Sequence, residues 1–232
     1  MSGLVPGRLS RGTTLWVGTA LVAVAFVVAA ISGAYHISLD QLWGLIGRGL
    51  SGGPLDSPEQ LVFLNIRLPR LVLAVAAGAG LAVAGALMQG LFRNPLADPG
   101  LIGISSGAAL AAGLTIVVGQ RWFPDLPHAL GSWTLVLFAF IGGLAVTVLI
   151  YLFAQGPMGT SVGVMLLAGV AVNAVAGAGL GYLNFIATDE QLRNIQFWLM
   201  GSLGGGRWSA VMLIAGVVAL GSTAALAWAR PL

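Results

Sequence analysis

The chain has 232 residues, of which 58% are hydrophobic and 7% are charged, and its formal net charge is +3. Soluble domains carry about 25% charged residues, so this composition indicates an integral membrane protein. The apolar runs are long and uninterrupted, which favours an all-α, polytopic helical membrane protein over a transmembrane β-barrel. The small and scattered positive charge argues against nucleic acid as a partner.

Two residue types are missing, and their absence excludes several kinds of site. The chain has no cysteine, so a disulfide, a thiolate metal site and a cysteine nucleophile are excluded. It also has no lysine, which excludes a P-loop, because the lysine of that motif reaches the nucleotide phosphates. We therefore expect no cofactor in this chain, and any ATP that drives it must be bound by a partner subunit.

The apolar runs predict six membrane spans, with both termini on one side of the bilayer. The first run, residues 14–35, follows Arg8 and Arg11 and is longer than a signal-peptide core, so we interpret it as a retained span. A polar connection over residues 36–68 follows, with a short surface helix predicted at 39–50. The other five spans are predicted at residues 71–92, 99–119, 131–154, 162–187 and 208–229, with a connection over 188–207. The arginine distribution does not decide the orientation of these spans.

The second and third predicted spans form a hairpin with an unusual corner. Arg67 and Arg70 precede the second span, whose 22 uncharged residues would rise about 33 Å as a helix. The two spans are separated by a polar elbow that contains prolines and capping residues, namely Arg93, Asn94, Pro95, Asp98 and Pro99. Because proline lacks the N–H that a helix interior needs, the elbow cannot continue either helix.

One face of the second span carries only small side chains, which recur every four residues: Ala74, Gly78, Ala82, Ala86 and Gly90. In lipid, such a face lets another helix backbone approach closely. The pattern predicts helix packing, and a more specific role for this face is an equal alternative.

The predicted spans contain no ionisable residue, which argues against a proton-coupled carrier and against an intramembrane hydrolase of the metal or aspartyl type. The fifth span again shows polar and small residues at a spacing of four: Gly169, Asn173 and Gly177. Asn173 either bonds two helices together or lines a translocation path, and both interpretations stay open. The two histidines, His36 and His128, lie in predicted loops, where solvated side chains are commoner than metal ligands. We predict no metal site and no enzyme activity.

Several motifs of this chain together resemble one family. They are Ile66 to Arg70 (IRLPR), Gly85 to Gly90 (GALMQG), Arg93 to Gly103 (RNPLADPGLIG), Leu167 to Ala171 (LAGVA) and Trp198 to Leu203 (WLMGSL). In this order they resemble the FecCD-type permeases, the membrane subunits of bacterial ABC importers for iron–siderophore complexes, haem and vitamin B12. The resemblance covers about residues 35–232.

The resemblance implies partner subunits and a cellular location. It predicts a multi-pass protein of the bacterial inner membrane, paired with a second permease subunit, most simply as a homodimer. A cytoplasmic subunit would bind ATP, and an extracytoplasmic substrate-binding protein would dock on Arg67 and Arg70 through its acidic residues. Anchoring of these arginines among lipid head groups is the alternative. The elbow would be cytoplasmic.

The resemblance also predicts which residues line a translocation path and how much of a permease domain this chain covers. The fifth span would line the translocation path through Gly169, Asn173 and Gly177, and Thr160 and Ser161 would contribute to a cytoplasmic gate. Family members have ten spans, so residues 1–232 are expected to be the N-terminal part of a permease domain, ending before the coupling helices. The alternatives are an ion-coupled secondary carrier and a truncated membrane protein that transports nothing.

Overall fold

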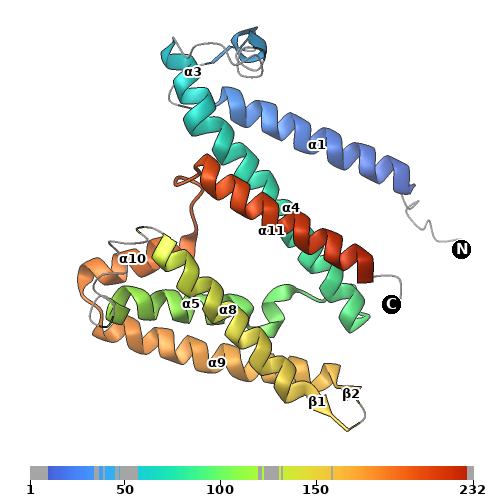
Figure 1. Ribbon diagram of the computed structural model, residues 1–232, viewed down its shortest axis with the longest axis vertical. Coiled ribbons are helices and arrows are strands. Elements are labelled where there is room, and N and C mark those ends of the chain that lie inside the picture. The colour runs from blue at the N-terminus through green and yellow to red at the C-terminus, as the bar shows by residue number, and fades with distance from the viewer. Residues whose placement is uncertain are drawn as a thin grey trace, which may run out of the picture. The chain divides into compact units, whose positions relative to one another are not determined.

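The computed structural model describes residues 10–33, 37–38, 40–44, 47, 57–119, 122, 131, 133–157 and 159–228. Helices form nearly all of this part of the chain, which confirms the predicted all-α, polytopic class (Figure 1). His36 and His128 lie outside the described residues, as does half of the surface helix predicted at 39–50.

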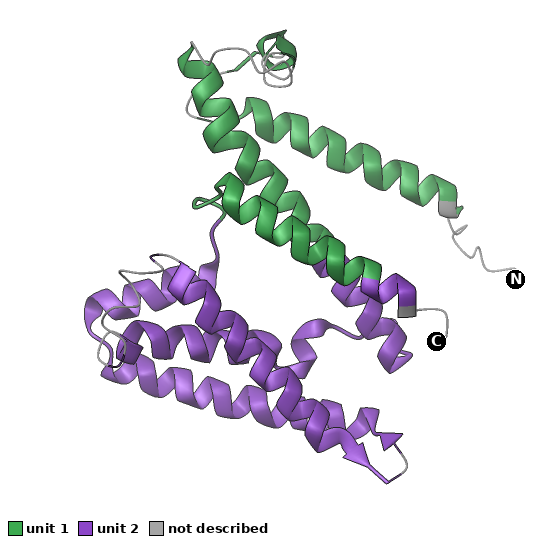
Figure 2. Cartoon of the chain, in the orientation of Figure 1, with its two compact units in different colours: residues 1–79, 203–223 green, residues 80–202, 224–232 purple. Residues whose placement is uncertain are grey.

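The chain divides into two compact units (Figure 2). Unit 1 comprises residues 1–79 and 203–223, and unit 2 comprises residues 80–202 and 224–232. The division passes through one long helix near residue 79 and through the last helix near residue 223. Each unit has its own apolar core.

Unit 1 is built on the long helix. It begins as α3 (Pro58–Val62), continues through a π-helical turn (Phe63–Arg67) and runs on as α4 (Leu68–Phe92). The unit also contains α1 (Arg11–Ile31) and most of α11 (Trp208–Trp228). Its core lies where the end of α1 meets the π-helical turn, and its buried members are Ala30, Ile37, Leu42 and Phe63.

Unit 2 is a group of three packed helices, α5 (Ile104–Leu114), α8 (Trp133–Ala154) and α9 (Val162–Ile186). A 3₁₀ turn (Pro99–Ile102) precedes α5, and a π-helical turn (Thr115–Gly119) extends it. An antiparallel pair of short strands, β1 (Gln155–Gly156) and β2 (Gly159–Thr160), joins α8 to α9 with Gln155 opposite Thr160. The main core contains Ile102, Ile150, Ala154 and Met165, and the last turns of α4 pack against it through Met88 and Phe92.

In the part of the chain that the structure describes, five helices are long and apolar enough to cross a membrane: Gly12–Ile31, Pro58–Phe92, Trp133–Ala154, Val162–Ile186 and Trp208–Ala227. The predicted span at residues 99–119 corresponds to a shorter apolar helix, Ile104–Gly119. It is shorter because Pro99 and the left-handed Gly103 (φ 77°) confine the residues before it to a 3₁₀ turn.

The helix that contains the second predicted span begins before residue 71, within the predicted 36–68 connection. The helix begins at Pro58, where the Ser57 side chain accepts a hydrogen bond from the Gln60 N–H and proline occupies the first helical position. The charges of Glu59, Arg67 and Arg70 made this stretch resemble a loop, although a helix can extend beyond the apolar layer of a membrane.

The predicted 188–207 connection is also more structured than expected. It contains α10 (Asp189–Met200), which begins with a reciprocal capping box between Thr188 and Gln191. Ile195 of α10 is buried against Val117 and Leu183, so α10 packs on the end of unit 2.

Candidate functional site

The Arg67 side chain holds the end of α1. Its Nη1 donates a hydrogen bond of 2.8 Å to the carbonyl of Ala30, in the last turn of α1. The last carbonyls of a helix have no partner within the helix, and a cation there also complements the helix dipole. Gly33 follows with φ 146°, a conformation that favours glycine, and a Cβ at this position would lie 2.7 Å from Arg67 Nη2, so a larger residue would also displace the guanidinium.

The Arg70 side chain holds a different segment, which we call the glycine turn and define as residues 203–207. Arg70 Nη2 donates a hydrogen bond of 3.0 Å to the carbonyl of Gly204. Gly206 is buried on the stem of the same side chain, where an added Cβ would lie 3.0 Å from Arg70 Cγ. The turn therefore rests on Arg70, and this contact explains why glycine occupies position 206.

Pro69 lies between the two arginines, just after the π-helical turn (Phe63–Arg67), and its ring nitrogen cannot donate to the helix. The Leu68 N–H bonds to the carbonyl of Phe63, five residues back, instead of to Leu64. The next N–H that could reach Leu64 in a π-helical pattern belongs to residue 69, where proline has none. The indole Nε1 of Trp208 fills this place with a hydrogen bond of 3.0 Å to the Leu64 carbonyl.

These contacts make the Phe63–Arg70 segment a junction within unit 1. It binds the end of α1 through Arg67 and the beginning of α11 through Arg70 and Trp208. Arg70 is exposed, whereas Arg67 is partly buried. Docking of a partner on these arginines stays a prediction. Sequence reasoning missed Trp208, and the signal that points to it is a proline within a helix, which leaves a backbone carbonyl without its usual donor.

The elbow interrupts the helices as predicted. Arg93 adopts φ 49°, and the N–H groups of Arg93 and Asn94 bond to the carbonyls of Gly90 and Gln89, which is the Schellman arrangement that ends a helix. The Asn94 side chain accepts from the Leu96 N–H at 2.9 Å, and Asp98 accepts from the Gly100 N–H at 2.7 Å at the start of the 3₁₀ turn. Pro95 and Pro99 complete this corner. Its cytoplasmic location stays a prediction.

The small-residue face of α4 is largely open. Ala82, Ala86 and the glycines at 78 and 90 are exposed, whereas Ala74 is partly buried. A Cβ added at Gly78 or Gly90 would meet no other atom within 4 Å in the part of the chain that the structure describes. Close packing of this face against another helix therefore stays a prediction.

A close helix crossing lies elsewhere, between α5 and α8. A Cβ at Gly107 would lie 2.9 Å from the Gly142 carbonyl oxygen, and a Cβ at Gly142 would lie 2.6 Å from the Gly107 carbonyl oxygen. Gly143 lies over Ile104 in the same interface. Sequence reasoning missed this crossing, although Gly142 and Gly143 form the one glycine pair within α8.

The three predicted path residues of α9 have different surroundings. Gly169 is buried, and a Cβ there would collide with the carbonyl oxygen of Leu101, so its position serves packing against the 3₁₀ turn. Asn173 Oδ1 lies beside Gly103, is buried and accepts no hydrogen bond from the described residues. Gly177 is exposed and has open space around it.

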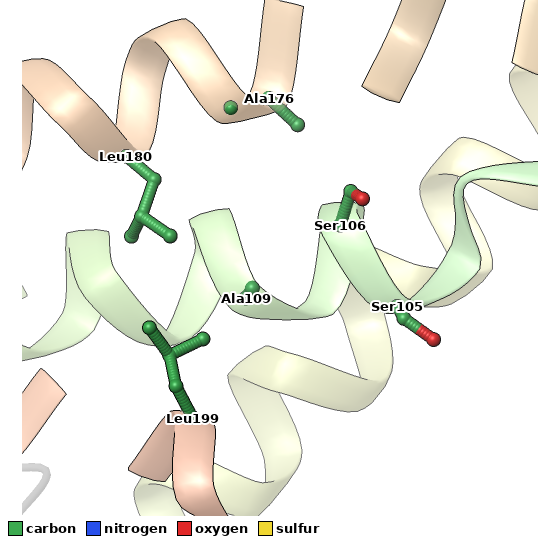
Figure 3. Close-up of a pocket in the computed structure, with 7 residues that line it drawn as sticks. Ser105, Ser106, Ala109, Ala176, Leu180 and Leu199 are labelled. Atoms are coloured by element: carbon green, nitrogen blue, oxygen red, sulfur yellow. The ribbon is translucent and has the colours of Figure 1, made fainter. Parts of the chain in front are cut away.

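Gly177 lines a pocket of about 300 Å³ within unit 2. The side chains of Leu180 from α9 and Leu199 from α10 point toward α5 (Figure 3). The other lining residues are Ser105, Ser106, Ala109 and Ala176, so the lining is apolar apart from two hydroxyl groups. None of these residues is charged, and the pocket offers hydrogen bonds but no metal ligands or acid–base groups.

The two predicted gate residues lie beside each other at the start of α9. Thr160 is in β2, and the Ser161 side chain accepts a hydrogen bond of 3.4 Å from the Val164 N–H, which caps α9. Both residues are exposed. Among the described residues, no three His, Cys, Asp or Glu side chains gather in a way that could hold a metal ion.

The chain is similar to known transport proteins over most of its length. A profile described as the FecCD transport family matches residues 21–232. The chain is 41% identical over 218 residues to the hemin transport system permease protein of Yersinia pestis, covering 94% of this chain and 60% of that protein. It is 36% identical over 167 residues to the vitamin B12 import system permease protein of Salmonella arizonae, covering 72% of this chain and 48% of that protein.

A solved structure is similar as well. A metal-chelate type ABC transporter in an inward-facing conformation superposes with a TM-score of 0.74 at 28% identity. The match covers 94% of this chain and 62% of the other chain. The chain therefore spans between about half and three fifths of the length of the proteins it matches.

Proposed function

Because the chain belongs to the FecCD transport family, we propose that it forms part of the membrane permease subunit of a binding-protein-dependent ABC importer. The observation that carries this proposal is the family match over residues 21–232, which includes both the arginine motif and the elbow. The proposed cargo is a metal chelate of the iron–siderophore, haem or cobalamin class. Relatives named for haem and for vitamin B12 support this range without selecting one member.

The composition of the long helices supports a permease whose energy is supplied by a separate subunit. Helices α8, α9 and α11 contain no Asp, Glu, Lys, Arg or His. Proton-coupled carriers place ionisable side chains at membrane depth, where they relay the proton. We propose that a separate cytoplasmic subunit binds ATP and that a second permease subunit completes the pore, as a homodimer in the bacterial inner membrane.

The proposed docking site for an extracytoplasmic binding protein centres on Arg70. Its side chain is exposed, and a guanidinium binds carboxylates with two parallel hydrogen bonds. Arg67 contributes less to docking in this proposal, because it is partly buried against the end of α1. Exposed charge pairs of this kind mainly set the rate and register of association and weaken with salt.

We further propose that the path is lined by Asn173 and Gly177, with Thr160 and Ser161 near the cytoplasmic gate. The open space at Gly177 and the buried, unbonded oxygen of Asn173 support this assignment. Gly169 is left out of the lining, because its surroundings are filled by the backbone of Leu101.

Reconstitution tests the proposed function. The permease, with the ATPase and binding protein encoded at its own locus, is placed in liposomes, and uptake of radiolabelled haemin, cyanocobalamin and a ferric siderophore is measured. We expect ATP-dependent uptake of one of the three. Uptake that persists without ATP but stops when an ion gradient is removed favours a secondary carrier. No uptake of any cargo would contradict the importer proposal and favour a non-transporting membrane protein.

Charge reversal tests the docking site. Arg70→Glu is expected to weaken association with the binding protein and to remove most of its salt dependence. Arg207→Glu is the matched control, because it reverses an exposed charge in the neighbouring turn. Equal effects of the two variants would show that general charge attraction, rather than Arg70, guides association.

A further inference from the structure

The glycine turn is the connection between α10 and α11, and the boundary between the two units falls at its first residue, Leu203. Contacts with the long helix help to set its position on unit 1, and we consider three of them. Arg70 Nη2 donates to Gly204, Gly206 packs on the Arg70 stem, and Trp208 Nε1 donates to Leu64. Two of the three contacts therefore belong to one exposed arginine.

The contact from Arg70 to Gly204 joins a cation to a neutral carbonyl. A carboxylate is the stronger partner for the same guanidinium, because both groups are charged and the bond can be bidentate. The turn itself is adaptable, since three consecutive glycines occupy positions 204–206. Gly205 has open space, with no described atom within 4 Å of an added Cβ. A carboxylate that reaches Arg70 thus competes with a weaker acceptor held by a segment that can move.

We propose that an acidic group bound to Arg70 displaces the Gly204 carbonyl and releases the glycine turn from the long helix. Docking then changes the connection between α10 and α11, while the bond from Trp208 to Leu64 keeps the start of α11 in place. This inference rests on the proposed function, in which acidic residues of a binding protein dock on Arg70. It adds that docking and the turn compete for one side chain.

Competition has a reciprocal consequence that can be measured. If docking must break the contact to Gly204, a change that weakens this contact and leaves Arg70 in place must strengthen docking, at most by the same factor. Trp208→Phe keeps the aromatic ring and removes the N–H that bonds to Leu64. We expect this variant to bind an acidic ligand more tightly than the unchanged chain, by about fivefold if the loss of one net hydrogen bond is fully felt at the turn.

A spin label reports the turn directly. The chain has no natural cysteine, so Gly205→Cys carries the only label when it reacts with a nitroxide. The labelled full chain is placed in phosphatidylcholine nanodiscs, which avoid anionic lipid, and label mobility is read from the EPR spectrum. In this background, Arg70→Met retains much of the apolar stem beneath Gly206 and removes the donors and the charge.

Arg207→Met is the matched control, because it removes the same charge from the glycine turn itself. We expect Arg70→Met to raise the ratio of mobile to immobile label about fivefold, the factor for the loss of one net hydrogen bond. Arg207→Met is expected to leave the ratio unchanged. If the two variants give the same spectrum, the contact from Arg70 does not hold the turn, and the proposal is wrong whatever docks there.

The acidic probe is fluorescein-labelled hexaglutamate at low ionic strength, with hexaglutamine as the neutral control. We expect hexaglutamate to bind, to mobilise the label in the otherwise unchanged chain, and to lose both effects in 0.5 M salt. If binding depends on Arg70 but the label stays immobile, the proposed displacement of the Gly204 carbonyl is refuted. If hexaglutamate does not bind, acidic docking on Arg70 is the part that fails, and the Arg70→Met spectrum still decides whether Arg70 holds the turn.

Discussion

Replacing Gly142 by alanine is expected to destabilise the packing of α5 against α8. The added Cβ would lie 2.6 Å from the Gly107 carbonyl oxygen and would also collide with the Cβ of Ala111, whereas real Cβ atoms essentially never approach within 3.0 Å. Both neighbours are parts of a helix rather than the end of a flexible side chain, so the helices themselves must separate. Overpacking of this kind costs about 1–3 kcal/mol, and separation also weakens any Cα–H···O contacts at the crossing.

Gly78→Ala is the matched control for this prediction. Gly78 lies within α4 and has no described atom within 4 Å of an added Cβ, so the same substitution meets no obstacle there. Alanine is favoured over glycine in a helix by about 0.5–1 kcal/mol, so this variant is expected to be at least as stable as the parent. The two variants therefore shift the free energy of unfolding in opposite directions.

The measurement is unfolding of the purified chain in a mild detergent titrated with SDS, followed by far-UV circular dichroism. We expect the midpoint of Gly142→Ala to fall clearly below that of the parent, and the midpoint of Gly78→Ala to stay or rise. Gly107→Ala should resemble Gly142→Ala, because its added Cβ would meet the Gly142 carbonyl oxygen at 2.9 Å. Equal midpoints for the variants at 142 and 78 would refute the close crossing.

Three further predictions concern the elbow and the π-helical turn. Arg93→Gly should stabilise the chain by about 1 kcal/mol, because glycine adopts φ 49° without the Cβ penalty, whereas Arg93→Ala should not; SDS titration distinguishes them. Asp98→Ala should destabilise it by about 1 kcal/mol through loss of the cap on Gly100, while Asp98→Asn retains the acceptor and most of the stability in the same assay. Pro69→Ala should restore an N–H donor near Leu64 and so make the stability of the chain less dependent on Trp208. Trp208→Phe should therefore lower the free energy of unfolding less in the Pro69→Ala background than in the parent. A double-mutant cycle measures this difference.

The features that could be predicted from sequence are those with a local cause. The elbow is non-helical because Pro95 and Pro99 cannot continue a helix, and the structure shows the helix ending at Phe92, just before it. The apolar runs predicted five long helices of the described part of the chain, and most of their ends agree with the structure to within a few residues. The family resemblance came from motifs and is confirmed by the match over residues 21–232.

The features that could not be predicted depend on contacts between distant segments. Glycines at a spacing of four drew attention to the face of α4 that carries Gly78, yet a close backbone approach between two helices joins Gly107 to Gly142. Spacing shows which residues share a helix face, but it does not show which face meets another helix. The partners of the arginines were hidden for the same reason, because Arg67 bonds to a carbonyl 37 residues away and Arg70 to one 134 residues away.

The IRLPR motif illustrates how one local irregularity organises its surroundings. Pro69 cannot donate a backbone hydrogen bond, the helix widens into a π-helical turn, and the Leu64 carbonyl becomes available to Trp208. The arginines on either side of Leu68 and Pro69 then diverge to the end of α1 and to the glycine turn. The motif that we propose as a docking site therefore also holds three segments of its own chain. In our proposal, a partner that binds Arg70 acts on the connection between α10 and α11, because the guanidinium that would bind the partner also holds Gly204.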